Sequence, residues 1–262
     1  MNVIESWISN LKYSGYNHTC ESKSDFLKLT KLPRVWRRIL SKIAIKPGCR
    51  CFEVGCGGGI HLVRLALNGY LVSGIDCSPE VIVRAKNFIE QVALFDNKVK
   101  SISILVGDFL SDDYYKIEGK YNLVFDFGVV EHFLDRKDRL EFFQRKAKLA
   151  KENGYVVSVV PSGIHPYRTI QKERGLGGYK IPEIDYTPKL LKTEMIESGA
   201  SDVIVLPHNI FGYLNLFSGR TLIIRKTIYY LFQAFPQNLF SQSFLEKHAF
   251  SYIAIGRVNQ CK

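Results

Sequence analysis

The chain has 262 residues and a formal net charge of +11, with 46% hydrophobic and 23% charged residues. These fractions are ordinary for a soluble globular protein, and the length suits one large α/β domain that carries a cap. The six cysteines form no C-x-x-C pair and no cysteine–histidine cluster at zinc spacing, which argues against a zinc site. We read them as reduced thiols in a cytosolic protein.

The positive charge is concentrated in two flanking segments. Residues 1–48 hold nine Lys/Arg against three Asp/Glu, and residues 161–262 hold twelve against seven, whereas residues 49–160 balance at fifteen each. An acidic substrate or an anionic surface is one interpretation, and solvated faces are the other. The first ten residues have no apolar run, so we expect no signal peptide and a cytoplasmic location, with contact to a membrane surface left open.

Residues 1–46 are predicted to form a helical cap segment ahead of a domain spanning 47–262. Apolar side chains at helical spacing follow one another along its second half, and Pro47-Gly48 then interrupts the chain before the first strand. The clearest stripe consists of Val35, Trp36, Ile39, Leu40 and Ile43. Trp7, Ile8 and Leu11 form a second apolar patch.

The stretch at 49–59 organises the domain. Its sequence, Cys-Arg-Cys-Phe-Glu-Val-Gly-Cys-Gly-Gly-Gly, begins as a strand and ends as a glycine turn that enters a helix. Such a turn presents backbone N–H groups and the positive end of a helix dipole to a polar ligand. The dinucleotide fingerprint G-x-G-x-x-G fails here, because Ile60 stands at its last position.

Strands and helices then alternate, which predicts a parallel, doubly wound sheet. Ligands bind beyond the carboxyl ends of such strands, and polar residues follow three of them. Asp76 follows the second strand, Gly107-Asp108-Phe109 the third, and Asp126-Phe127-Gly128 the fourth. The expected strands are 49–54, 71–75, 102–106, 123–125, 155–160, 203–206 and 252–258, and the main helices are 78–94, 136–151 and 187–198.

The run from Glu53 to Gly59 resembles motif I of the class I S-adenosylmethionine-dependent methyltransferases of the small-molecule type. The resemblance implies a Rossmann-like fold, with a mostly parallel seven-stranded sheet, helices on both faces and a helical cap. It also implies that S-adenosylmethionine is the cofactor and S-adenosylhomocysteine the product. The residues it implies for cofactor binding are Glu53, Gly55, Cys56, Gly57, Gly59, Asp76, Cys77, Ser78, Gly107, Asp108, Phe109, Asp126, Phe127 and Gly128.

Two of the implied cofactor residues have a plainer alternative. Asp76 would accept the ribose hydroxyls of the cofactor, but it could instead cap the helix that begins at Ser78-Pro79. Asp108 would accept from the adenine amino group, but Gly-Asp after a strand is also a common turn.

Methyl transfer is an in-line displacement in which the protein chiefly aligns the reacting atoms, and an oxygen or nitrogen nucleophile also needs a base. His132 and His165, which follow the fourth and fifth strands, are the candidate bases, and each could instead be structural. In the family that the chain resembles, quinone-type O-methyltransferases carry a glutamate three residues before their Glu-His pair, and together these residues form a divalent-metal site. That position is Gly128 here, so Glu131 and His132 alone would bind a metal poorly and we predict none.

Residues 208–250 form an apolar, aromatic insert within the domain. It could be a lid over the substrate, a dimer face or cap core, or a helix lying on a membrane surface, since no run is long enough to span one. The sequence thus predicts methylation of an oxygen, less readily a nitrogen, of a small organic acceptor. The acceptor could be acidic, aromatic, lipid-like or a sugar intermediate. The rivals are an RNA or protein methyltransferase using the basic flanks and a non-catalytic protein that keeps the cofactor fold.

Overall fold

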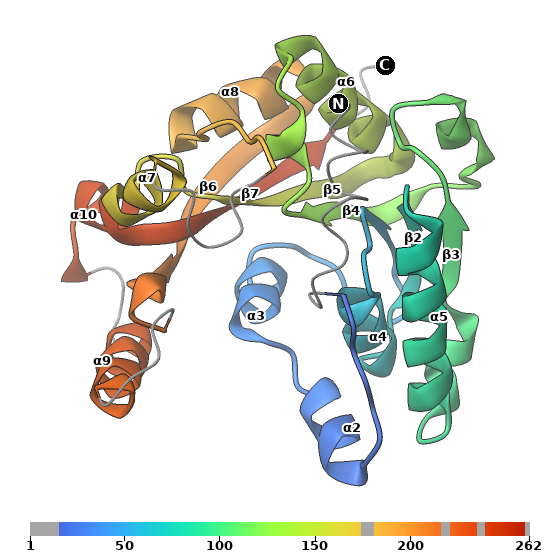
Figure 1. The fold of residues 1–262 in the computed structure, drawn as a ribbon. Helices are drawn as coiled ribbons and strands as arrows, with labels where there is room; N and C mark the ends of the chain where they lie inside the picture. The colour runs from blue at the N-terminus through green and yellow to red at the C-terminus, as the bar shows by residue number, and fades with distance from the viewer. Residues whose placement is uncertain (1–15, 174–180, 216–220, 235–238, 260–262) are drawn as a thin grey trace.

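The computed structural model describes residues 16–173, 181–215, 221–234 and 239–259, and these form a single seven-stranded sheet with helices on both faces (Figure 1). The strand order is β3-β2-β1-β4-β5-β7-β6, and only β7 runs antiparallel to its neighbours. The predicted fold class is therefore confirmed. The strands are β1 (Arg50–Val54), β2 (Leu71–Asp76), β3 (Ser103–Val106), β4 (Tyr121–Phe127), β5 (Ala150–Pro161), β6 (Ala200–Ile210) and β7 (Ala249–Val258).

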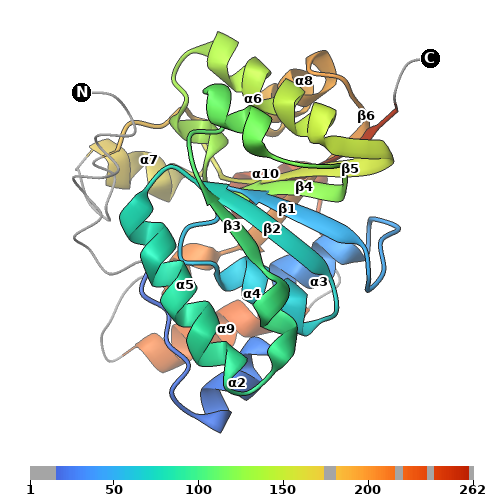
Figure 2. The same ribbon diagram turned by 90° about the vertical axis from the view of Figure 1, so that its right-hand side faces the viewer.

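Two sets of helices cover the sheet. In Figure 2, α6 (Arg136–Leu149) and α8 (Pro188–Glu197) lie above it, and the earlier helices lie below. Those are α2 (Lys23–Leu29), α3 (Arg34–Leu40), α4 (Ile60–Leu67) and α5 (Pro79–Ala93). Three more helices belong to the second half of the chain: α7 (Pro166–Glu173), α9 (Leu222–Ala234) and α10 (Gln242–His248). Short 3₁₀ turns η1–η4 span 97–101, 112–116, 130–132 and 212–215.

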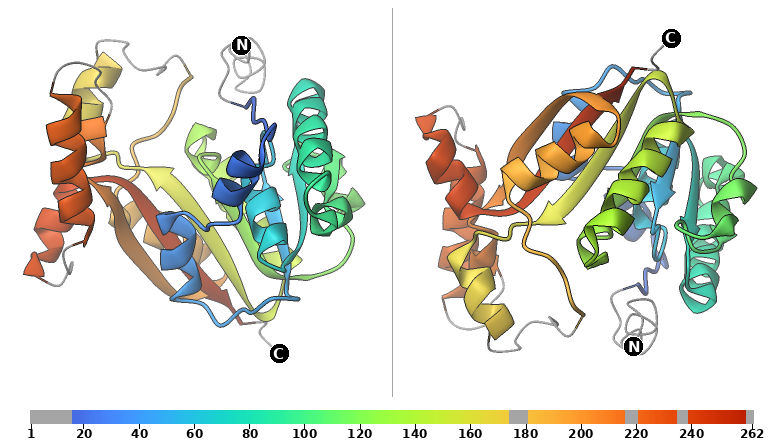
Figure 3. Two further views of the ribbon diagram at one scale, coloured as in Figure 1. Left: turned by 90° about the horizontal axis from the view of Figure 1, so that it is seen from below. Right: turned by 90° about the horizontal axis from the view of Figure 1, so that it is seen from above.

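Alternate side chains of each strand enter two separate cores. On β1, Phe52 and Val54 pack toward α6 and α8, whereas Cys51 packs toward α3, α4 and α5. This alternation follows from the two-residue period of a strand, and because both faces are covered, four of the five residues of β1 are buried. The two views of Figure 3 show one helical layer each, α2 to α5 from below and α6 with α8 from above.

The predicted apolar stripe of the N-terminal segment is confirmed for α3 and the turn after it. Trp36, Ile39 and Ile43 are buried against the sheet, where the Trp36 ring meets Phe125 edge-on. Trp7, Ile8 and Leu11 lie outside the described residues. The five described cysteines are free thiols, as predicted.

The strands of the second half are longer than predicted. Asn153-Gly154, which lies between the predicted helix 136–151 and the predicted strand 155–160, is part of β5. It forms an irregularity where the pairing with β4 shifts, and Asn153 adopts a φ of 59°. α6 therefore ends at Leu149. β6 and β7 extend to Ile210 and from Ala249, so the predicted insert at 208–250 includes the ends of both strands.

Candidate functional site

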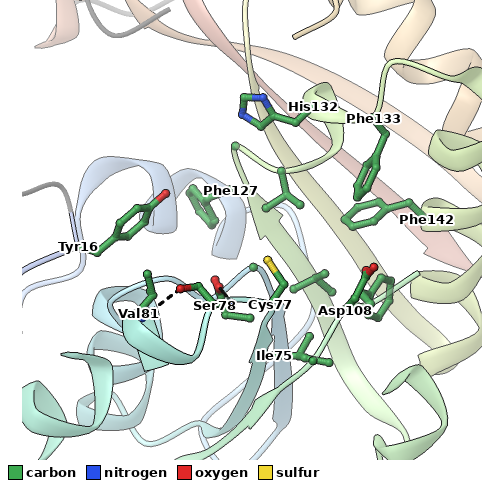
Figure 4. A pocket seen from close by; sticks show the side chains of 17 residues that line it. Tyr16, Ile75, Cys77, Ser78, Val81, Asp108, Phe127, His132, Phe133 and Phe142 are labelled. Atoms are coloured by element: carbon green, nitrogen blue, oxygen red, sulfur yellow. Dashed lines mark hydrogen bonds between the residues drawn. The ribbon is translucent and has the colours of Figure 1, made fainter. Parts of the chain in front are cut away.

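A cavity lies where the strand order reverses between β1 and β4, at the carboxyl ends of the parallel strands (Figure 4). Open α/β sheets bind their ligands at such a switch point. The lining comes from the ends of β1, β2 and β4, the turn after β3, the start of α5, the segment after β4, α6 and Tyr16. It consists of Tyr16, Val54, Gly55, Ile75, Asp76, Cys77, Ser78, Val81, Gly107, Asp108, Phe109, Phe127, Gly128, Val129, His132, Phe133 and Phe142.

The glycine turn between β1 and α4 is packed too closely for side chains. Gly55 has a φ of 68°, and a Cβ there would lie 2.5 Å from Cγ2 of Val129. A Cβ on Gly58 would lie 2.4 Å from the backbone oxygen of Tyr16. The turn therefore requires glycine both for its left-handed backbone and for the segments that cross it.

Asp76 holds this turn against the next one. Its Oδ2 accepts from the Gly57 amide at 2.9 Å, and its Oδ1 accepts from the Ser78 amide at 3.0 Å. Burial raises the pKa of Asp76, and the two amide donors oppose that rise. Ser78, not Asp76, is the side chain that caps α5, since its Oγ accepts from the Val81 amide. Each Asp76 oxygen keeps lone-pair capacity for a further donor in the cavity.

The turn after β3 supplies the opposite wall. Asp108 Oδ1 accepts from the Leu110 amide at 2.9 Å, so the carboxylate also stabilises its own turn. Phe109 is buried against Tyr114 and Phe142, at ring-centroid distances of 5.5 and 5.4 Å. Phe142 belongs to α6 and also lines the cavity, which joins this wall to the helical layer above the sheet.

Glu53 is buried beneath the glycine turn. Only 1% of its surface is exposed, and its Oε2 has no hydrogen-bond partner among the described residues. Burial raises the pKa of Glu53 well above its ordinary value, and the charges of Asp76 and Asp126 add to the rise. An orphaned buried carboxyl next to a cavity fits a site that is completed by a cationic group of a ligand.

Asp126 lies in a buried polar network rather than on the cavity wall. Its Oδ1 pairs with Nζ of Lys146 on α6 and accepts from Oγ of Ser158 at 2.5 Å. Lys146 also donates to the Val157 carbonyl at 2.8 Å and to Ser158 Oγ at 2.7 Å. Both charged side chains have no exposed surface, so the network joins α6 to β4 and β5.

The structure thus brings most of the sequence-predicted cofactor residues to one cavity. Those on its wall are Gly55, Asp76, Cys77, Ser78, Gly107, Asp108, Phe109, Phe127 and Gly128. Glu53, Cys56, Gly57, Gly59 and Asp126 are not on the wall; the first four belong to the end of β1 and its turn.

Comparison with known proteins agrees with this geometry. The family described as "Methyltransferase domain" matches residues 52–154, a range that begins within β1, contains β2, β3 and β4 and ends within β5. A ubiquinone biosynthesis O-methyltransferase of Xanthomonas campestris is 24% identical over 164 residues, 54% of this chain and 64% of the relative. One from Coxiella burnetii is 30% identical over 149 residues, 49% of this chain and 59% of the relative. A methyltransferase structure from Archaeoglobus fulgidus superposes with a TM-score of 0.58 at 16% identity, covering 85% of this chain and 91% of that one.

Residues 52–154 thus belong to a methyltransferase domain, and the described chain has the fold of the class I S-adenosylmethionine-dependent methyltransferases. It spans less than two thirds of the length of the two ubiquinone relatives, and the structural match at 16% identity bears on the fold alone.

Tyr16 lines the cavity but was not identified from the sequence. Its ring lies over the glycine turn, 2.9 Å from where a Cβ of Gly57 would stand, and Figure 4 shows it across the cavity from His132. Burial raises the pKa of Tyr16, and the charge of Asp76 adds to this. Tyr16 lies upstream of every motif, so no spacing rule could have identified it. The apolar wall residues Val129, Phe133 and Phe142 were equally unmarked in the sequence.

His132 is the candidate base that reaches the cavity of the methyltransferase. Its Nδ1 lies 3.1 Å from the Pro182 carbonyl, which can only accept, so Nδ1 carries the proton and Nε2 the lone pair in the neutral ring. Burial lowers the pKa of His132, although the contact with Pro182 and the charge of Glu183 oppose this. The ring is therefore neutral at pH 7 and has the protonation state that a base requires.

His165 does not line the cavity. It is 2% exposed, its Nδ1 accepts from the Tyr167 amide at 3.2 Å, and its ring packs between those of Tyr213 and Phe250. Burial lowers the pKa of His165 to about 4. These contacts are those of a side chain that holds α7 against β7 and the segment after β6.

One group of described side chains could offer three ligands to a metal. Glu131, His132 and Glu183 place ligand atoms within 4.8 Å of one another, and a backbone hydrogen bond from Ile184 to Glu131 holds the two segments together. The sequence could not show that Glu183 joins the Glu-His pair. Arg168 and Lys172 already pair with Glu183, so its charge is neutralised without a metal. The absence of a metal stays a prediction.

Proposed function

We propose that the chain transfers a methyl group from S-adenosylmethionine to an oxygen, or less readily a nitrogen, of a small organic acceptor. The observation that carries this proposal is that the His132 ring shares one cavity with the carboxylates of Asp76 and Asp108. The first is a base with a suitable tautomer, and the other two are acceptors suited to a nucleoside. The O-methyltransferase names of the relatives support oxygen as the atom methylated.

The fit of the cofactor rests on this chain's own polar groups. Asp76 would accept the ribose hydroxyls with the lone pairs that Gly57 and Ser78 leave unused. Asp108 would accept from the adenine amino group, with Phe109 beside the ring. Glu53 would attract the ammonium of the methionine part from beneath the turn, because its orphaned Oε2 and raised pKa are those of a carboxyl without a cation.

Bound S-adenosylmethionine supplies an activated methyl group, so the chain needs only to align the acceptor and receive its proton. His132 Nε2 would take the proton from the acceptor hydroxyl while Nδ1 stays bonded to Pro182. Val129 and Phe133 form the apolar part of the wall near His132 and would exclude water from the reacting atoms. Alignment of this kind supplies much of the rate enhancement in a displacement reaction.

The outer segments are proposed to build the acceptor side. Tyr16 on the cavity wall supports the role of residues 1–46 as a cap, and the domain is proposed to span 47–262. The pair of α9 and α10 between β6 and β7 corresponds to the insert at 208–250. His165 is proposed to act as a structural residue of this side rather than as the base.

The test is formation of S-adenosylhomocysteine from S-adenosylmethionine in the presence of phenols, prenylated phenols, carboxylic acids and amines. We expect turnover with at least one hydroxylated acceptor and a loss of about 10²-fold or more in His132→Gln. His248→Gln, which changes a half-buried histidine away from the cavity, serves as the control. Cofactor binding without turnover on any small acceptor, combined with methylation of RNA or protein, would contradict the proposal.

A further inference from the structure

Helix α9 exposes an apolar face that the rest of the described chain does not cover. Its inner side is accounted for: the Tyr229 hydroxyl donates to Asn209 Oδ1 at 2.6 Å, and Phe232 packs on Phe211 with ring centroids 4.7 Å apart. The opposite side points to solvent, and we call it the outer face of α9. It consists of Ile223, Ile224, Thr227, Tyr230 and Leu231, of which the four large apolar side chains are between 55% and 78% exposed.

The outer face is more apolar than is usual for a helix face that is exposed to water. Ile223, Thr227 and Leu231 are spaced four apart and so lie along one line of the helix. Single exposed apolar side chains are common, but a contiguous patch of this kind marks an interaction site. Leu239, in the segment after α9, is also 67% exposed.

The two charged residues of α9 itself, Arg225 and Lys226, are both cations. From Val203 to Leu245 the sequence holds Arg220, Arg225 and Lys226 and no Asp or Glu. On α3, Arg34 lies near the Tyr229 hydroxyl, and its charge opposes the rise that burial causes in the pKa of Tyr229.

Figure 1 places α9, α3 and α2 on the same side of the sheet. Those two early helices belong to the described residues 16–48, which hold eight Lys/Arg against two Asp/Glu. Arg37 of α3 is exposed. The apolar helix therefore shares its side of the molecule with an excess of positive charge.

We propose that the outer face of α9 docks on an anionic lipid bilayer, with its isoleucine, leucine and tyrosine side chains at the level of the headgroups and the neighbouring cations against the lipid phosphates. Apolar side chains that insert, flanked by cations above them, are the features of a helix that lies in a membrane interface. A second copy of this chain would fit less well, because two such faces would bring Lys226 and its neighbours of like charge together. Within the described part of the chain, no helix is long and apolar enough to cross a membrane, so the contact is peripheral.

The test is flotation of the full chain with vesicles of pure phosphatidylcholine and vesicles of equal parts phosphatidylcholine and phosphatidylglycerol. We expect binding to the anionic vesicles and much weaker binding to the neutral ones. Lys226→Glu should lower the partition coefficient by about fivefold or more, since each cation near an anionic surface contributes about that factor. The double variant Ile223→Ser/Leu231→Ser should lower it by about tenfold or more.

The matched control is Leu94→Ser, because Leu94 is an apolar side chain that is 84% exposed at the end of α5. It should bind vesicles as the native chain does, and circular dichroism should show all variants folded. Absence of binding to anionic vesicles would overturn the proposal, as would binding that the double variant leaves unchanged. Sedimentation that shows a dimer dissociated by the double variant, without vesicle binding, would assign the face to a second copy instead.

Discussion

Replacement of Lys146 by methionine tests whether the buried polar network holds α6 against β4 and β5. Lys146 makes three contacts in the native chain, with Asp126, the Val157 carbonyl and Ser158 Oγ. Methionine fills a similar volume but leaves the Asp126 carboxylate without its cation at a position that has no exposed surface. Burial lowers the pKa of Lys146 and the Asp126 carboxylate opposes this, so the charge of Lys146 depends on the carboxylate.

The expected cost follows from that orphaned charge. Removal of one partner of a buried ion pair destabilises a protein by about 3–5 kcal/mol, a large part of the 5–15 kcal/mol that typically holds a domain folded. At about 2–4 °C for each kcal/mol in a chain of this size, the melting temperature should fall by roughly 6–20 °C. A second change, Asp126→Asn, removes the charge and should restore much of the loss.

The assay is urea unfolding followed by circular dichroism for Lys146→Met, the double variant and Lys148→Met. Lys148 is exposed on the same helix, so its change should stay within about 0.5 kcal/mol of the native chain. If Lys146→Met were as stable as Lys148→Met, the buried pair would not exist in solution and the reasoning would be refuted.

Three further predictions concern the cavity. Gly55→Ala should weaken cofactor binding by tenfold or more, because the added Cβ would lie 2.5 Å from Val129. Gly48→Ala should bind the cofactor normally, because a Cβ there would have no atom within 4 Å. Calorimetric titration of both variants tests this prediction. The rate of methyl transfer should be constant above pH 6.5 and should fall as the pH is lowered further. The reason is that burial lowers the pKa of His132 below 6.5 and only the neutral ring accepts a proton. A rate that keeps rising above pH 6.5 would contradict the role of His132 as the base. Removal of divalent ions with EDTA should leave the rate unchanged, because Glu183 is already paired with two cations. If EDTA abolished activity and Mg²⁺ restored it, a metal site would be present.

The parallel half of the fold could be predicted because its signals are local. Each strand up to β5 contains apolar residues and is ended or followed by Gly, Asp or Pro, and Ser78-Pro79 marks the start of α5 directly. Residues placed after these strands reach a common edge whatever the details of the loops, which is why Asp76 and Asp108 were identified.

The remaining features depend on contacts between distant segments. Nothing near Tyr16 in the sequence reveals that it lies over a turn more than forty residues away, and Glu183 joins Glu131 and His132 only through the pairing of Ile184 with Glu131. The sequence indicated Asp126 as a cofactor residue because it follows the predicted strand 123–125. Its side chain instead pairs with Lys146, and the many charged residues of α6 gave no sign that this lysine is buried.

The most direct test is calorimetric titration of the purified chain with S-adenosylhomocysteine, compared with Asp76→Ala and Asp96→Ala. Asp96 also accepts from a backbone amide, that of Lys98, but lies outside the cavity, so it controls for the loss of a turn-stabilising carboxylate. We predict micromolar binding by the native chain and Asp96→Ala and its loss in Asp76→Ala. Absence of binding by the folded native chain, or equal binding by all three, would contradict the assignment of this cavity to the cofactor.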